Sequence, residues 1–149
     1  LARPQCALYT RYLLDQLRKK IIEKGRLFPG TLDLKGVENL RTFRQFDDRF
    51  TAPLHGFRDA LDYWRRSSSV RFLSGIDRRT CIINAANDPF LGPRCYPVAQ
   101  VRANPRLTLL APRTGGHVGF VGSGRGRMYW SEWVAMRFVQ GLPCPHVQE

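Results

Sequence analysis

Two polar residues stand at matching places along the chain, and together they could move a proton. Asp88 follows the short β-prone run 80–86, and His117 follows a second such run, 107–111. A histidine with an ordinary pKa of about 6.5 can take a proton from a hydroxyl and return it to a leaving group if a carboxylate fixes its tautomer. The two residues are therefore a candidate acid–base pair for nucleophilic catalysis.

Strands are the elements that must position this pair. An open α/β sheet presents polar residues on the loops at the carboxyl ends of its strands, and both runs end in turn residues. Gly115 and Gly116 allow a tight turn just before His117. Taken singly, His117 could be a surface-loop histidine, and Asp88 could form the turn of an Asp-Pro pair. The sequence does not exclude these two alternatives.

Helices dominate the rest of the predicted structure. Apolar residues at helical spacing predict helices over 7–24, 37–46, 57–66 and 130–140. Gly25 is the predicted C-cap of the first helix. Trp64, Trp130 and Trp133 are predicted to anchor the core.

Three sequence blocks follow one another along the chain: FDDRFTAPLHGF at 46–57, NAANDPFL at 84–91 and GGHVGFV at 115–121. Together they resemble the YheT-like branch of the α/β-hydrolase superfamily, and the resemblance covers essentially the whole chain. It implies an α/β fold, with a helical cap or connecting region over 1–79 and, over 80–149, the last two core strands, the Asp and His loops and a terminal helix. It also implies that Asp88 is the triad acid and His117 the triad base.

The nucleophile of such a triad has no counterpart in this sequence. No Gly-x-Ser-x-Gly occurs, and the nearest stretch, 122–126, lies after the histidine and is expected to be a flexible loop. Cys81, in the middle of a predicted buried strand, is expected to be inert packing. We therefore expect the C-terminal half of a longer serine hydrolase, with its missing N-terminal half, nucleophile and oxyanion hole upstream of Leu1. Alone, it is expected to hydrolyse nothing.

Carboxylic esters, small or lipid-like, are the substrates that the resemblance implies, and no metal or cofactor is expected. His55 could line the substrate pocket from the cap, although burial among neighbours with backbone partners is the favoured alternative. Asp47 and Asp48 are expected to cap or brace helices by pairing with nearby arginines.

Composition narrows the class of protein. With 149 residues, 43% of them hydrophobic and 24% charged, the chain fits a single packed domain. Four cysteines without a Cys-x-x-Cys pair indicate neither zinc nor disulfides, which favours the cytoplasm. The net charge of +12 raises an alternative, a basic module that binds nucleic acid or an anionic membrane. Because the basic residues are spread along the chain, no nucleic-acid partner is expected, whereas peripheral membrane contact stays open.

Overall fold

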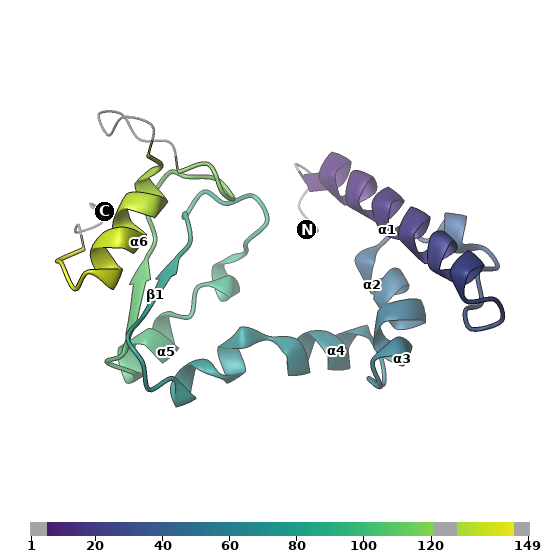
Figure 1. Ribbon diagram of the computed structural model, residues 1–149, viewed down its shortest axis with the longest axis horizontal. Helices are drawn as coiled ribbons and strands as arrows, with labels where there is room; N and C mark the ends of the chain where they lie inside the picture. Colours follow the sequence, from purple (N-terminus) through teal and green to yellow (C-terminus); the bar gives the residue numbers. More distant parts are fainter. Residues whose placement is uncertain (1–5, 121–127, 145–149) are drawn as a thin grey trace. The chain divides into compact units, whose positions relative to one another are not determined.

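The computed structural model describes residues 6–120 and 128–144. The chain forms two compact units, Leu1–Ser68 and Ser69–Glu149 (Figure 1). The loop expected at 122–126 lies outside the described residues. The expected division into a cap region and a core region at residues 79 and 80 stays a prediction, because compactness alone does not say which residues form a cap.

The first unit begins with a long helix, α1 (Ala7–Leu27). Leu14 and Ile21 lie two turns apart and are buried on one face. The prediction that Gly25 ends this helix is wrong: Gly25 lies inside it, where a Cβ would come within 2.6 Å of the Leu34 side chain. The helix ends before Phe28, which precedes a proline, because a residue in that position is pushed out of the α conformation.

Short helical pieces complete the first unit: η2 (Val37–Asn39), α2 (Phe43–Phe46), the π-helix η3 (Asp47–Thr51), α3 (Ala52–Leu54) and α4 (Ala60–Ser67). The predicted helix over 37–46 is interrupted, because Leu40 is extended and Thr42 opens a new helix with a capping box to Gln45. Phe46 and Phe50 join Leu14, Ile21 and Val37 in the core of this unit.

The second unit has a parallel two-stranded sheet, β1 (Thr80–Ile83) and β2 (Leu107–Leu110), joined through α5 (Val98–Ala103). Short 3₁₀ turns η4 (Ser69–Arg71) and η5 (Leu73–Gly75) precede β1, and η6 (Pro93–Cys95) precedes α5. Helices followed by parallel strands confirm the α/β prediction and fit part of an α/β-hydrolase fold. β1 is half-buried, so the prediction of a buried strand is wrong for it.

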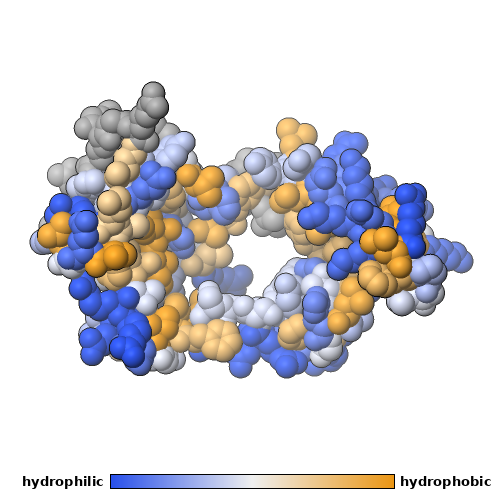
Figure 2. Space-filling view, in the orientation of Figure 1, coloured by the Kyte–Doolittle hydropathy of each residue, from blue (hydrophilic) through white to orange (hydrophobic). Residues whose placement is uncertain are grey.

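The last helix, α6 (Trp130–Val139), contacts β1 and buries Val134 completely. Its opposite side exposes apolar residues such as Met136 and Val139, and Figure 2 shows apolar colour over α6 and the neighbouring strands. Trp130 and Trp133 are half-buried, but Trp64 on α4 is 40% exposed, so the prediction of a core anchor is wrong for Trp64. The indole N–H of Trp64 donates a hydrogen bond to the Asp47 carboxylate near the surface, so the ring is not packed inside.

Candidate active site

The two strands bring their following loops to the same edge of the sheet. Ile83 pairs with Leu110 in the parallel register, and the ladder continues beyond the strands. Asn84 N–H donates to the Leu110 carbonyl at 3.0 Å, and Ala86 N–H donates to the Pro112 carbonyl at 2.8 Å. Because the two backbones stay paired to this point, the loops that carry Asp88 and His117 leave the sheet side by side.

Asp88 and His117 meet directly. The Nδ1 atom of His117 lies 2.8 Å from Oδ2 of Asp88, and the Asp88 side chain is only 3% exposed. The other carboxylate oxygen, Oδ1, accepts the backbone N–H of Phe90 at 2.8 Å. Both oxygens of a buried carboxylate are thus used, and one of them is held against the imidazole.

This contact decides which ring nitrogen of His117 can react. A carboxylate only accepts hydrogen bonds, so the neutral imidazole carries its proton on Nδ1 and leaves the lone pair on Nε2. The His117 side chain is 54% exposed, and Nε2 has no hydrogen-bond partner among the described residues. The arrangement can therefore take up a proton at Nε2, with the resulting imidazolium stabilised by Asp88.

The loop before His117 is tightly wound. Gly116 has a φ of +58°, and the Gly115 carbonyl accepts the N–H groups of both Gly119 and Phe120 at 3.0 Å. Phe120 itself has a φ of +37°, an unusual value for a residue with a side chain. Such a conformation persists only where the surroundings enforce it. The ring of Phe120 stacks on Trp130 at 6.0 Å between centroids.

Asn87 joins the two loops, a role that the sequence analysis missed. Its Oδ1 accepts the backbone N–H of Gly116 at 2.9 Å. Asp88 follows Asn87 in the sequence and His117 follows Gly116, so this hydrogen bond connects the segments that carry the acid and the base. A side-chain acceptor next to Asp88 and a Gly-Gly pair next to His117 are the signals that could have suggested it.

Aromatic side chains complete the surroundings of the pair. The ring of Phe90 packs edge-to-face against His117 with centroids 4.8 Å apart, which restricts rotation of the imidazole. The hydroxyl of Tyr96 donates to the Ala85 carbonyl at 2.6 Å, at the start of the Asp88 loop. Neither contact was foreseen from the sequence, because neither residue shows a spacing pattern of its own.

His55 is placed at the end of α3 in the first unit and is exposed. The favoured expectation of a buried histidine satisfied by the backbone is therefore wrong, because the glycine turn at Gly56 carries the chain along the surface. Contact with substrate stays a prediction for this residue. Cys81 is partly buried, and this burial, with a smaller effect of Cys144, raises the pKa of its thiol.

No helix in the described parts of the chain is both long and apolar enough to cross a bilayer.

Comparison with known proteins finds relatives whose names describe enzymes that act on esters, among them the following three. The chain is 38% identical over 117 residues to the candidate esterase YheT of Escherichia coli K12, a match that covers 77% of this chain and 34% of that protein. It is 36% identical over 122 residues to a monoacylglycerol lipase of Saccharomyces cerevisiae, covering 80% of this chain and 27% of the lipase. With the phospholipase ABHD3 of Mus musculus it shares 29% identity over 136 residues, 91% of this chain and 33% of the relative.

The chain thus spans about a third of the length of the curated relatives it matches. No family model and no solved structure matches it. The parallel strands, with polar loops at one edge, belong to an α/β fold. The chain belongs to the α/β-hydrolase superfamily, and within it to the YheT-like branch.

Proposed function

We propose that this chain contributes the acid, Asp88, and the base, His117, of a serine hydrolase that cleaves carboxylic esters. The observation that carries the proposal is the 2.8 Å contact between His117 Nδ1 and the buried carboxylate of Asp88. The names of the relatives, an esterase candidate and two lipases, support esters as the substrate class.

The nucleophile in this proposal is a serine hydroxyl from a part of the protein outside these 149 residues. His117 Nε2 removes the hydroxyl proton as the serine oxygen attacks the ester carbonyl carbon, and returns that proton to the departing alcohol. A water molecule then attacks the acyl carbon and gives a proton to Nε2, and that proton passes to the serine oxygen as its bond to the acyl group breaks and the acid is released. In both steps Asp88 holds the ring orientation and balances the positive charge of the imidazolium.

The substrate side of the site belongs to the proposal as well. Small or lipid-like esters fit the names of the relatives, and His55 is the residue of the first unit that we propose touches the substrate. Exchange of His55 for Ala is expected to raise KM while kcat stays within a factor of about two. An unchanged KM for every ester tested would remove His55 from the site.

The central experiment measures p-nitrophenyl butyrate hydrolysis by the longer polypeptide that contains these residues. Asp88→Asn and His117→Ala are each expected to lower kcat by a factor of about 10³ or more, because each removes the proton transfer or its orientation. Asp77→Asn is the matched control: this side chain is 83% exposed, and its ion-pair partner among the described residues is Arg78 at 3.6 Å. Variants of Asp88 and His117 with unchanged kcat would refute the proposal.

The 149-residue chain by itself is expected to show no turnover of p-nitrophenyl acetate, because the proposed nucleophile is not part of it. Turnover that disappears on His117→Ala would contradict this expectation and would point to a nucleophile within the chain.

A further inference from the structure

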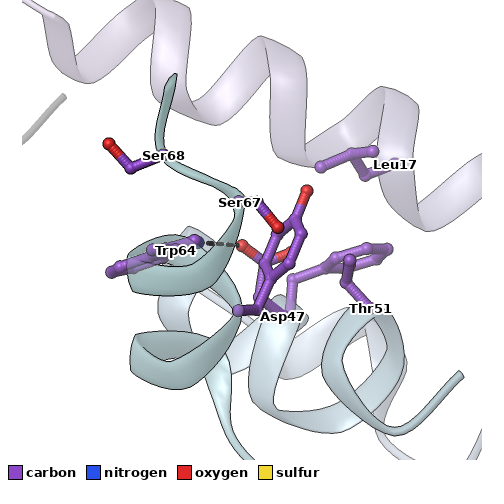
Figure 3. A pocket seen from close by; sticks show the side chains of 8 residues that line it. Leu17, Asp47, Thr51, Trp64, Ser67 and Ser68 are labelled. Atoms are coloured by element: carbon purple, nitrogen blue, oxygen red, sulfur yellow. Dashed lines mark hydrogen bonds between the residues drawn. The ribbon is translucent and has the colours of Figure 1, made fainter. Parts of the chain in front are cut away.

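A cavity in the first unit is not used by the proposed reaction. It opens widely to solvent and has a volume of about 550 Å³, within the range of roughly 300–1,000 Å³ that is common for ligand pockets. Leu17 lines it from α1, Trp64 and Ser67 line it from α4, and Asp47 and Thr51 line it from η3 (Figure 3). All of its walls belong to one compact unit, so the cavity is a property of that unit alone.

The π-helix η3 shapes one wall of this cavity. Ala52 N–H donates to the Asp47 carbonyl five residues back, and the following Pro53 has no N–H with which to continue an α-helical ladder. The wider turn carries Asp47 and Thr51, both of which line the cavity. Such π-helical turns are rare in proteins, and many of those that occur lie at functional sites.

Asp47 brings an unneutralised carboxylate to the cavity. Its Oδ2 accepts the indole N–H of Trp64 at 2.7 Å, drawn as a dashed line in Figure 3. Within the described part of the chain it has no ion pair, whereas its neighbour Asp48 accepts the Ala60 N–H at 2.7 Å and pairs with Arg44 at 3.7 Å. The expectation that both aspartates pair with arginine is therefore wrong for Asp47.

The other walls combine aromatic rings and open hydroxyls. Phe46, Tyr63 and Trp64 supply the rings. Thr51 and Ser67 supply hydroxyls that have no hydrogen-bond partner among the described residues. No lysine or arginine in the described part of the chain lines the cavity, although the whole chain has 24 of them.

We propose that this cavity binds a small organic ammonium group that carries a hydroxyl. A carboxylate beside aromatic rings attracts such a cation through charge and through the ring quadrupoles, and the open hydroxyls of the wall can bond the hydroxyl of the ligand. An anion is disfavoured by the unneutralised Asp47, and a metal ion by the presence of a single carboxylate. The proposal does not depend on the hydrolase activity.

The test is a titration of the 149-residue chain with choline, followed by the indole N–H signal of Trp64 in NMR spectra. Trp64→Phe identifies that signal among those of the three tryptophans. The comparison ligand is 3,3-dimethyl-1-butanol, which has the shape of choline with carbon in place of the charged nitrogen. We expect a saturable shift with millimolar choline, and affinity at least about fivefold weaker for the neutral alcohol.

Two variants separate the carboxylate from the fold. Asp47→Asn retains an oxygen that accepts the Trp64 N–H but lacks the charge, so it is expected to weaken choline binding about fivefold or more. Asp77→Asn, with the same loss of charge on an 83% exposed side chain of the second unit, should bind as the parent chain does. Thermal unfolding of each variant checks that it is folded.

Equal binding of choline and the neutral alcohol, which the parent chain alone can reveal, would overturn the proposal, as would parent-like binding by a folded Asp47→Asn variant. Absence of any shift up to about 100 mM choline would also overturn it, because binding that weak is not recognition.

Discussion

Gly115 is the position where one added methyl group should damage the candidate site most. A Cβ there would lie 2.7 and 2.8 Å from two ring carbons of Phe120 and 2.9 Å from the Cβ of Ala85. Contacts under 3.0 Å require something to move. Ala85 is fully buried and Phe120 is 9% exposed, so neither has open space beside it.

The neighbouring ring is also held in place. Phe120 stacks on Trp130, and its N–H donates to the Gly115 carbonyl at 3.0 Å. Gly115 itself has a φ of +155°, which a residue with a side chain rarely adopts. Overpacking a rigid site costs about 1–3 kcal/mol and an unfavourable backbone conformation a similar amount, so Gly115→Ala should destabilise the second unit by about 2–6 kcal/mol.

Urea unfolding, followed by tryptophan fluorescence, measures this loss. Gly92→Ala is the matched control, because a Cβ at Gly92 meets nothing within 4 Å and its φ is −92°. The control should stay within about 0.5 kcal/mol of the parent chain. Equal stability of the two variants would refute the reasoning, since the packing of Phe120 against Gly115 would then be absent in solution.

Three further predictions follow from other contacts. Asn87→Ala removes the acceptor for the Gly116 N–H and should lower the unfolding free energy by about 1 kcal/mol, whereas Asn87→Asp, which keeps an oxygen there, should lose less; urea unfolding compares them. Burial raises the pKa of the Cys81 thiol above the ordinary value of 9.0, so at any pH below 9.0 iodoacetamide should label Cys81 more slowly than the exposed Cys95, as mass spectrometry would show; equal labelling would contradict this. Asp59 is the N-cap of α4, and its pKa is lowered mainly by a hydrogen bond from Arg58. The stability that its carboxylate adds is present above the unfolded pKa of 3.8 and is lost as the pH falls below that value. Asp59→Ala should therefore make the melting temperature fall less steeply with decreasing pH in this acid range.

The order of the elements could be predicted because apolar periodicity and turn residues are local signals. The runs over 80–86 and 107–111 contain β1 and β2, and the polar residues after them meet because parallel strands end at one edge. Helix ends were less predictable. Gly25 has the residue type of a cap, but the packing of Leu34 beside it and the proline after Phe28 decide where α1 ends.

The exposure of the Trp64 side chain could not be predicted from the local sequence pattern either. Trp64 lies at helical spacing from other apolar residues of α4, which predicts a buried ring. The bond from its indole N–H to Asp47, 17 residues earlier, holds the ring at the surface instead. A preference of this kind depends on a partner from another turn of the chain, and periodicity within α4 carries no information about it.

Two pairs of adjacent polar residues show why the site could be located from the sequence but not built from it. In Asn87-Asp88, one side chain bonds the opposite loop and the other faces His117, each across 29 residues. In Asp47-Asp48, one carboxylate lines a cavity while the other bonds the start of α4. Consecutive residues point in different directions, so each member of a pair meets a different partner, and only the tertiary structure determines which of them holds the fold and which is left for chemistry.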